Sequence, residues 1–324
     1  MTKIRVGTDC SGIEAPIVAL KQMDVPHEHV FSCDYDKFVK KSFLENYSSD
    51  NDSHTFYDNI TTRDNSTVDD VDLYVCGFPC QSFSVAGKQE GFNDPRGTIF
   101  FHVHDFLQKK NPKIFVLENV KGLISHDKGK TMKTILSMCE DLGKYNIYHK
   151  VLNTLDYGVP QNRERIYIIG IRKDIPKSSE FEFPVPFPLK TYAKDIIDMK
   201  MSEDKNNTLT EWELNNLDHF IEKFMEKDVY LEKELHILDI GASRKFASIM
   251  NNICPCLKAS RCNYYVTNLG RKLTTQECLS FQGFPKDFKQ GVSNHQFYKQ
   301  IGNSMSVNVL VELFKKLLPM LKYK

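Results

Sequence analysis

The residue that we expect to carry nucleophilic chemistry is Cys80, within the string Gly77-Phe78-Pro79-Cys80-Gln81-Ser82-Phe83-Ser84. It follows an apolar stretch, Val71–Cys76, that is expected to be a strand, and Pro79 restricts the backbone directly before it. A cysteine at the end of a strand, next to a glycine-rich segment, is well placed to act as a thiolate nucleophile. A buried structural cysteine is the alternative for any single cysteine, so the neighbouring motifs must decide.

Two other strings carry charged groups of the kind that support such a nucleophile. Leu117-Glu118-Asn119-Val120 places a carboxyl at the end of a strand, and a carboxyl in a dry pocket can act as an acid. Gln161-Asn162-Arg163-Glu164-Arg165 places two guanidinium groups before an apolar strand. Taken singly, the first string is most often a turn and the second is most often a solvated face.

The elements that must position these residues form an alternating series of strands and helices. This alternation predicts an α/β fold with a largely parallel sheet, and reactive residues recur where strands end, at the edge where such sheets bind ligands. The expected strands are Ile4–Thr8, Val30–Cys33, Val71–Cys76, Ile114–Leu117 and Ile166–Ile171. The expected helices of this part are Glu14–Met23, Lys37–Asn46 and Thr131–Leu142.

The rest of the chain is organised differently. Gln81–Thr98 is polar, contains three glycines and lacks periodicity, which predicts a lid or binding loop. Prolines after Arg172 indicate a linker or extended rim, and Glu211–Leu235 has the apolar spacing of a helix. Basic residues predominate from Arg244 onward, and Ser304–Leu321 is expected to be a second helix.

Composition sets outer limits on the function. The chain has 324 residues, of which 41% are hydrophobic and 26% charged, which is ordinary for a globular protein. It has no apolar run of membrane-spanning length and no signal-peptide pattern, so we predict a soluble, intracellular protein. The net charge of +1 gives no nucleic-acid signal, so any such surface must be local. Nine cysteines indicate reduced thiols, and the Cys254, Cys256 and Cys262 spacing does not favour a metal site.

Read in order, these strings resemble the motifs of the C5-cytosine-specific DNA methyltransferases. The eight residues around Cys80 resemble the nucleophile motif, and the strings around Glu118 and Arg163 resemble the acid and arginine motifs. Arg271-Lys272-Leu273-Thr274 through Gln282-Gly283-Phe284-Pro285 resembles the segment that supports the recognition domain, and Gln300-Ile301-Gly302-Asn303-Ser304 resembles the final motif. Five motifs in one order are far more specific than any one alone.

The resemblance implies a catalytic set of Cys80, Glu118, Arg163 and Arg165. Cys80 would add to C6 of a flipped-out cytosine and so make C5 nucleophilic. Glu118 would contact N3 and the exocyclic amine, carrying or sharing a proton, while Arg165 would hold O2. Arg163 would support Glu118 and the nucleophile loop. The Phe78 carbonyl would accept a hydrogen bond from the cytosine amine and so help to reject thymine.

The resemblance also implies S-adenosylmethionine as the cofactor, with S-adenosylhomocysteine as product, in a Rossmann-like fold. The family's first motif is typically Phe-x-Gly-x-Gly, whereas this chain has Cys10-Ser11-Gly12-Ile13-Glu14 and so lacks the aromatic residue and the second glycine. Asp34 would bind the ribose hydroxyls, Tyr35 would stack on adenine, and Asn59 would accept from and donate to the adenine edge. The remaining cofactor-binding residues implied are Ile60, Gly77, Pro79, Ile99, Asn303 and Ser304.

Double-stranded DNA is the implied substrate, read by a smaller lobe. The expected domains are residues 1–183 plus 300–324 for catalysis and cofactor binding, 184–270 for target recognition, and 271–299 as a supporting segment, with DNA in the cleft between the lobes. The expected DNA contacts are Ser84, Arg96, Arg244, Lys258, Arg261, Asn263 and Tyr264. A solvated basic rim is an equally good interpretation of any one of those in the smaller lobe.

Three alternative functions compete with this interpretation. An RNA cytosine methyltransferase usually has Pro-Pro-Cys-Gln-Pro-Phe-Thr at the nucleophile, and Phe-Pro-Cys-Gln-Ser-Phe-Ser here favours DNA. A catalytically inactive DNA-binding paralogue is disfavoured because the catalytic set is complete. A nicotinamide oxidoreductase is rejected because Gly7–Ala15 lacks the three-glycine fingerprint. We expect a monomeric modification enzyme of microbial or viral type; a cognate restriction endonuclease acting independently stays an open alternative.

Overall fold

The computed structural model describes residues 3–48, 53–79, 99–200, 209–245, 247–260 and 263–321. The chain divides into two compact units. The first unit comprises Met1–Leu152, Glu164–Val185 and Val309–Lys324; the second comprises Asn153–Arg163 and Pro186–Asn308. The division near residue 185 lies close to the expected boundary, but two segments expected in the larger lobe, 153–163 and 300–308, belong to the second unit.

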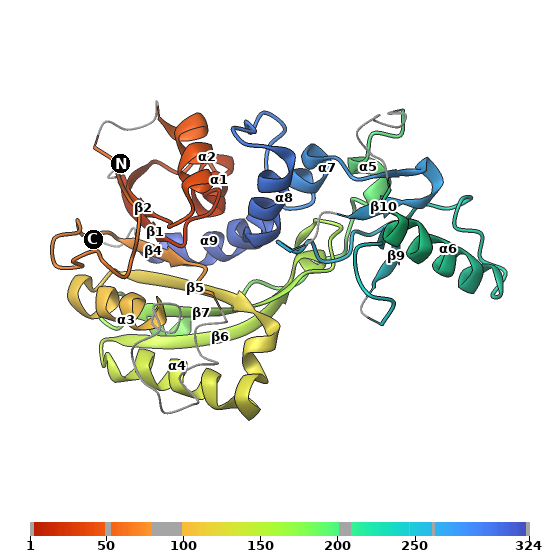
Figure 1. Cartoon of the computed structure of the whole chain (residues 1–324). Coiled ribbons are helices and arrows are strands. Elements are labelled where there is room, and N and C mark those ends of the chain that lie inside the picture. Colours follow the sequence, from red (N-terminus) through yellow and green to blue (C-terminus); the bar gives the residue numbers. More distant parts are fainter. Residues whose placement is uncertain are drawn as a thin grey trace. The chain divides into compact units, whose positions relative to one another are not determined.

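The first unit contains a seven-stranded sheet in the order β3-β2-β1-β4-β5-β7-β6 (Figure 1). Its strands from β3 to β5 run parallel, and β7 pairs antiparallel with β5. The α/β class with a largely parallel sheet is therefore confirmed. The strands are β1 (Ile4–Asp9), β2 (His27–Cys33), β3 (Thr55–Tyr57), β4 (Leu73–Cys76), β5 (Ile114–Val120), β6 (Tyr145–Asn153) and β7 (Glu164–Arg172).

Helices cover both faces of this sheet, and Figure 1 shows α1 and α2 on the opposite side from α3 and α4. The helices are α1 (Ala15–Gln22), α2 (Lys37–Tyr47), α3 (Ile99–Lys110) and α4 (Lys130–Asp141). One hydrophobic core contains buried residues of α3 and α4 together with strand residues such as Tyr74, Phe115 and Ile166. This core holds the strands whose ends carry the expected site residues.

The sequence prediction missed three elements of this unit. The first is β3, which has only three residues, and the second is β6, an outer strand whose side chains are mostly half-exposed. Neither has the continuous apolar run that marked the central strands. The third is α3, although its buried Phe100, Val103, Phe106 and Leu107 do follow helical spacing.

The second unit contains a four-stranded antiparallel sheet in the order β11-β10-β8-β9. Its strands are β8 (His236–Asp239), β9 (Ile249–Asn251), β10 (Tyr264–Val266) and β11 (Arg271–Lys272). Leu217 and Phe220 of α6 (Glu211–Met225) pack on Leu238 and Ile240 at β8. The other helices are α5 (Ala193–Ile196), α7 (Thr275–Ser280), α8 (Asn294–Asn303) and α9 (Val307–Leu321), whose greater part belongs to the first unit.

Short 3-10 helices connect several of these elements. They are η3 (Lys121–Ile124), η4 (His126–Gly129), η5 (Thr154–Tyr157), η6 (Ser178–Glu180) and η7 (Thr267–Leu269).

Two expected helices have different bounds in the structure. The helix expected over Glu211–Leu235 ends at Met225, because Asp228 adopts the left-handed conformation with φ 57° and the chain then turns into β8. The helix expected over Ser304–Leu321 begins at Val307, since Ser304 is extended and closes the preceding helix α8.

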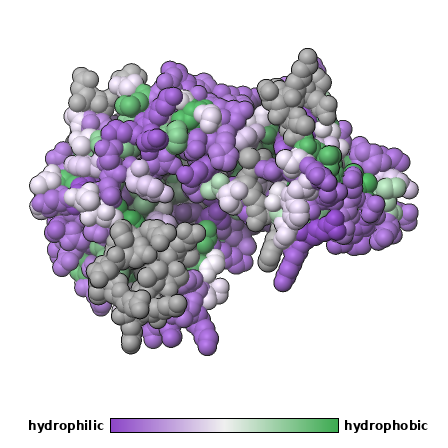
Figure 2. Space-filling view, viewed as in Figure 1, coloured by the Kyte–Doolittle hydropathy of each residue, from purple (hydrophilic) through white to green (hydrophobic). Residues whose placement is uncertain are grey.

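The described residues form no broad apolar region in the view shown. Figure 2 shows a mostly hydrophilic face on which hydrophobic residues form small separate groups. Within the described residues, no helix is both long and apolar enough to cross a membrane. In the same part of the chain, no group of three or more His, Cys, Asp or Glu side chains could hold a metal ion.

Candidate active site

Glu118 and Arg165 form an ion pair where β5 and β7 lie side by side in the first unit. Glu118 lies opposite Tyr167 in the antiparallel register, so Arg165 is its diagonal neighbour on the same face of the sheet. The Arg165 Nε atom lies 3.1 Å from Glu118 Oε1, and the two side chains are 14% and 8% exposed. The structure thus brings together two of the four expected catalytic residues at a strand end.

Asn119 fixes the backbone that leads to the expected nucleophile. Its Nδ2 donates to the Phe78 carbonyl over 2.7 Å, and both residues are buried. The carbonyl that was expected to accept from a cytosine amine therefore already accepts from this side chain. The acid motif contained Asn119, but its positioning contact could not be read from the sequence because it joins residues 41 positions apart.

Arg163 lies in the second unit and is 2% exposed. Its Nη1 donates to the Leu257 carbonyl over 2.8 Å, and its Nη2 donates to the carbonyls of Gly302 and Ser304 over 3.2 and 2.7 Å. A guanidinium at the C-terminus of α8 also complements the negative end of the helix dipole. Arg163 therefore organises its own unit, and its expected support of Glu118 stays a prediction.

The turn between β1 and α1 has an unusual backbone. Cys10, Gly12 and Glu14 all have positive φ, at 49°, 54° and 61°. The Gly12 N–H donates to Asp34 Oδ2 over 3.0 Å, and the Ser11 N–H donates to the Cys33 carbonyl over 3.1 Å. Although the family's glycine pattern is incomplete, the turn still folds against the end of β2.

The neighbouring strand end presents the groups expected for adenosine. Asp34 Oδ1 accepts from the Asp36 N–H over 3.0 Å, so both carboxylate oxygens are held by backbone donors. Tyr35, the next residue, is 83% exposed. A fixed carboxylate beside an exposed ring, next to a tight glycine turn, fits a ligand with hydroxyl groups and a flat base.

The structure corrects half of the role expected for Asn59. Its Oδ1 accepts from both the N–H and the hydroxyl of Thr61, each over 2.9 Å, so this oxygen closes the local turn. A carbonyl oxygen has two acceptor positions, and both are used. The expected acceptance from adenine is therefore wrong, whereas donation from Nδ2 stays a prediction. Ile60 beside it is 4% exposed.

Other expected cofactor residues lie at the ends of elements. Ile13 is buried in the turn before α1, Gly77 and Pro79 follow β4, and Ile99 begins α3. Asn303 ends α8, and Ser304 is buried behind it; both belong to the second unit.

The sequence analysis missed a buried ion pair at the end of β1, directly before the turn that leads to α1. Arg63 donates to both oxygens of Asp9, the last residue of β1, over 2.7 and 2.8 Å, and the Tyr74 hydroxyl donates to Asp9 Oδ2 over 2.7 Å. Burial alone would lower the pKa of Arg63, but the Asp9 carboxylate raises it. The signal available was an arginine four residues after Asn59, too common a feature to single out.

Most of the DNA contacts expected in the second unit engage partners inside that unit. Lys258 Nζ lies 3.2 Å from the buried Asp239 carboxylate, and Asn263 donates to the Glu213 carboxylate. Arg244 is exposed, with a long 3.4 Å hydrogen bond to the Asn215 carbonyl. Of these residues, Arg244 has the side chain most available to an external phosphate.

The expected role of Tyr264 as a DNA contact is wrong. Its side chain is 1% exposed, its hydroxyl donates to the Cys256 carbonyl over 2.8 Å, and the same oxygen accepts from the Lys258 N–H over 2.9 Å. A buried and fully engaged phenol supports the Cys256–Lys258 backbone and cannot reach a base edge.

Four expected site residues lie outside the described part of the chain. They are Cys80, Ser84, Arg96 and Arg261, and the lid predicted over 81–98 lies there too.

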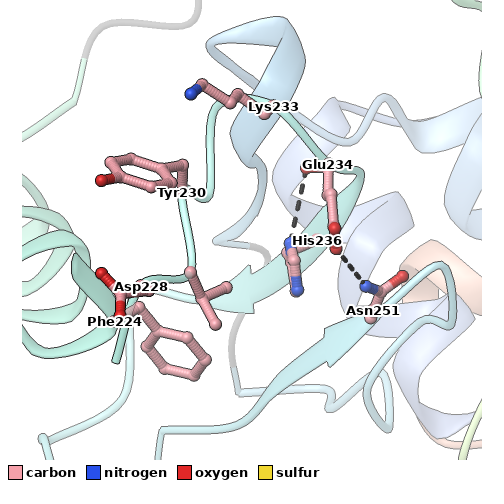
Figure 3. Close-up of a pocket in the computed structure, with 8 residues that line it drawn as sticks. Phe224, Asp228, Tyr230, Lys233, Glu234, His236 and Asn251 are labelled. Atoms are coloured by element: carbon pink, nitrogen blue, oxygen red, sulfur yellow. Dashed lines mark hydrogen bonds between the residues drawn. The ribbon is translucent and has the colours of Figure 1, made fainter. Parts of the chain in front are cut away.

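A small hollow of about 320 Å³ lies in the second unit between the end of α6 and the β8–β9 pair (Figure 3). Tyr230, Lys233 and His236 line it, and Glu234 accepts from Asn251 Nδ2 over 2.7 Å. None of the expected catalytic or cofactor residues lines this hollow, so it does not define the site.

Comparisons with known proteins agree with the family resemblance. The model of the family described as C-5 cytosine-specific DNA methylase matches residues 10–319. The type II methyltransferase M.HhaI of Haemophilus parahaemolyticus is 36% identical, covering 87% of this chain and 85% of its own length. M.NgoBI of Neisseria gonorrhoeae is 38% identical over 87% of this chain and 83% of its own.

Solved structures share the fold at lower identity. The S. pombe Dnmt2 methyltransferase aligns with a TM-score of 0.73 at 19% identity, covering 99% of this chain and 100% of its own. The Entamoeba histolytica methyltransferase EhMeth aligns with a TM-score of 0.72 at 18% identity, covering 100% of both chains. These matches confirm a Rossmann-like methyltransferase fold.

Proposed function

The chain belongs to the C-5 cytosine-specific DNA methylase family, and on that premise we propose that it methylates C5 of a flipped-out cytosine within a short DNA sequence. The observation that carries the proposal is the Glu118–Arg165 pair, 3.1 Å apart, at the end of β5 beside the backbone held by Asn119. These are the groups needed around a cytosine that is attacked at C6.

In the proposed reaction the Cys80 thiolate forms a bond to C6. The electron pair displaced from the C5–C6 double bond makes C5 nucleophilic and places negative charge toward N3. After C5 has gained the methyl group, it loses its proton, the C5–C6 double bond re-forms and the C6–S bond breaks to release the thiolate. Cys80 is thus regenerated, and 5-methylcytosine is the product.

The paired residues have separate tasks in this reaction. Glu118 contacts N3 and the exocyclic amine and supplies or shares the proton that neutralises N3 in the adduct. Arg165 holds O2 through its N–H donors and, through its contact with Glu118, fixes the direction of that carboxyl. Asn119 keeps the Phe78 backbone, two residues before the nucleophile, in place.

The cofactor proposed is S-adenosylmethionine, which supplies an electrophilic methyl group when bound. Asp34 would accept from ribose hydroxyls, since backbone donors already hold its carboxylate in one orientation. Tyr35 would stack on the adenine through its exposed ring, and Asn59 would donate from Nδ2 to the base edge. The fixed carboxylate and the exposed aromatic ring support this assignment.

Double-stranded DNA is the proposed substrate, and the second unit is proposed to read its sequence. Extracting a base from the stack costs a few kcal/mol, which must be balanced by contacts to the flipped base and the DNA backbone. Of the basic residues that we expect to contact DNA, Arg244 and Lys258 lie in the described part of this unit, retain some exposure and could meet phosphates. We further propose a monomer whose action does not require an endonuclease.

The covalent step can be tested with DNA that contains 5-fluorocytosine. Fluorine at C5 cannot leave as a proton does, so the enzyme should stay bonded to the base once the methyl group has been transferred. We expect a complex stable in denaturing electrophoresis with wild-type protein and S-adenosylmethionine, and none with Cys80→Ser.

The matched control is Cys256→Ser, which changes a half-buried thiol in the second unit and should leave trapping intact. A trapped complex in the Cys80→Ser variant would contradict the nucleophile assignment. Loss of trapping in both variants would point to a fold defect rather than to a missing nucleophile, and circular dichroism would identify it.

A further inference from the structure

Glu14 occupies the position at which the family's first motif has its second glycine. It precedes α1 directly and adopts the left-handed conformation, with φ 61° and ψ 46°. Glycine adopts this conformation freely, whereas a residue with a side chain does so at a cost of about 1–2 kcal/mol. The backbone conformation therefore does not explain why a glutamate occupies this position. The explanation must come from the contacts of its side chain.

Those contacts join two strands beneath the turn. The Glu14 side chain is fully buried. The Thr8 hydroxyl of β1 donates to its Oε1 and Oε2 over 2.9 and 3.1 Å, and the Ser32 hydroxyl of β2 lies 2.5 Å from Oε1. Thr8 is in turn 2.8 Å from the Ser11 hydroxyl, which accepts from the Cys33 N–H over 2.9 Å.

The chain of hydroxyl groups ends at the residues proposed to face the cofactor. Ser11 and Cys33 lie directly before Gly12 and Asp34, which are joined by the Gly12 N–H to carboxylate hydrogen bond. We expect a change at Glu14 to reach that hydrogen bond through Thr8 and Ser11.

We propose that Glu14 is a positioning residue for the cofactor: its carboxyl holds β1 against β2 beneath the Cys10–Gly12 turn and so orients the Gly12 N–H and the Asp34 carboxylate toward the ligand. The proposal rests on the cofactor assignment made above. In this chain, which lacks the family's second glycine, the buried Glu14 side chain would fix the shape of this turn.

The protonation state of this carboxyl makes the role measurable. The pKa of Glu14 is raised to about 8, chiefly by burial; the hydroxyl donors oppose this rise, and the nearby Asp34 carboxylate adds a smaller part of it. Two histidines face the same Ser32 hydroxyl, with the Nε2 atoms of His29 and His54 each 3.0 Å from it. Burial lowers the pKa of His54 to about 4 and that of His29 well below its usual value.

The network is therefore neutral near pH 7, and Glu14 is the member that ionises as the pH rises toward 9. On the side of β1, the nearby charges of Asp9 and Arg63 neutralise each other in their ion pair. Of the side chains described around Glu14, Tyr47 of α2 donates from its hydroxyl to the Ile13 carbonyl. Glutamine is a neutral mimic of the protonated carboxyl, so Glu14→Gln should preserve the contacts and remove the titration.

The test is calorimetric binding of S-adenosylhomocysteine to the full chain between pH 6.5 and 9. This ligand lacks the sulfonium charge, so attraction to an ionised Glu14 cannot mask a loosened turn. We compare wild type, Glu14→Gln and Glu14→Gly, and measure kcat and the cofactor KM in parallel. Subtracting the Glu14→Gln profile cancels the titration of the ligand itself.

At pH 6.5 we expect Glu14→Gln to bind the ligand with the wild-type affinity. At pH 9 the affinity of the wild type should be weaker, whereas the affinity of Glu14→Gln should be retained. Glu14→Gly should raise Kd and the cofactor KM about tenfold or more, corresponding to about 1.4 kcal/mol, with little change in kcat. Near-ultraviolet circular dichroism checks that both variants fold.

Identical pH profiles for wild type and Glu14→Gln, or wild-type affinity in a folded Glu14→Gly, would overturn the inference alone. Absence of binding by the wild type at pH 6.5 would overturn the cofactor assignment, and the inference with it. The two failures are therefore distinguishable.

Discussion

At the strand ends of the first unit, backbone donors hold Asp34 in place and Tyr35 stays exposed, whereas in the second unit basic side chains are paired with buried carboxylates. Lys258 pairs with Asp239, and Lys272 with Glu213. The first arrangement leaves polar groups and an aromatic face directed at a ligand. The second uses its polar groups chiefly to build the fold, so a cluster of basic residues there is a weak guide to DNA contacts.

The buried charged side chains of the two units also have different partners. In the first unit, Arg63 and Asp9 form an ion pair directly below the cofactor turn, and Glu118 and Arg165 form one at the proposed catalytic edge. In the second unit, Arg163 and Arg271 are both 2% exposed, and they bind backbone carbonyls and the Glu277 carboxylate. The comparison predicts that changes at the Glu118–Arg165 pair affect catalysis first, and that changes at the Arg63–Asp9 pair and at the buried arginines of the second unit affect folding first.

The largest effect on turnover is expected from Glu118→Gln. The amide keeps the shape but cannot supply a proton to N3, so kcat should fall by about 10²–10⁴-fold, the usual contribution of general acid catalysis. The measurement is methyl transfer from labelled cofactor to DNA under single-turnover conditions. The matched control is Glu164→Gln, which removes the exposed partner of Lys121 on the next strand and should change kcat less than about twofold. Equal losses in the two variants would contradict the assignment.

The next effect concerns the ion pair below the cofactor turn. Arg63→Met leaves the Asp9 carboxylate buried without its partner and should lower the free energy of unfolding by about 3–5 kcal/mol. The control Lys40→Met removes an exposed pair with Asp58 and should cost at most about 1 kcal/mol. Urea denaturation of the three proteins provides the comparison, and equal midpoints would show that burial does not strengthen the Arg63–Asp9 pair.

A pH-dependent effect on stability follows from the titration of Glu14. Its folded-state pKa of about 8 lies above the ordinary value of 4.5, so the folded state binds more protons between these pH values. The stability contributed by the protonated form is therefore complete below pH 4.5 and is lost as the pH rises toward 8. Relative to Glu14→Gln, the wild type should lose up to about 1.4 kcal/mol per pH unit in this window. Urea denaturation at several pH values measures this difference; a constant difference would refute it.

The smallest effects are expected at Arg244 and Tyr264, two residues of the second unit that the sequence analysis both predicted to contact DNA. Arg244→Ala should weaken DNA binding and reduce the salt dependence of log K by about one, the value for one phosphate contact. Tyr264→Phe should leave that slope unchanged and lower the free energy of unfolding by about 1 kcal/mol, because it removes buried hydrogen bonds. The reverse pattern in fluorescence anisotropy and urea denaturation would show that exposure is a poor guide here.

Sequence reasoning located the central strands and the family motifs because both are local signals. An apolar run such as Ile114–Leu117 and the order of the motifs can be read without knowing any contact. It failed where side-chain contacts decide the outcome: Asn59 Oδ1 closes a local turn, the buried Tyr264 hydroxyl binds the backbone of Cys256 and Lys258, and Arg63 meets Asp9 across 54 positions. It also extended the helix at Glu211 by ten residues, since apolar spacing continues beyond Met225 although the left-handed Asp228 ends it.

The most direct test of the central claim is methylation by the purified chain, read base by base. Unmethylated phage-sized DNA and an equimolar tRNA pool are each incubated with S-adenosylmethionine and the protein, and then sequenced after bisulfite treatment. The proposed function predicts protected cytosines in one short recurring DNA context and none in tRNA. Protection confined to tRNA, or no protection in either despite measurable cofactor binding, would contradict it.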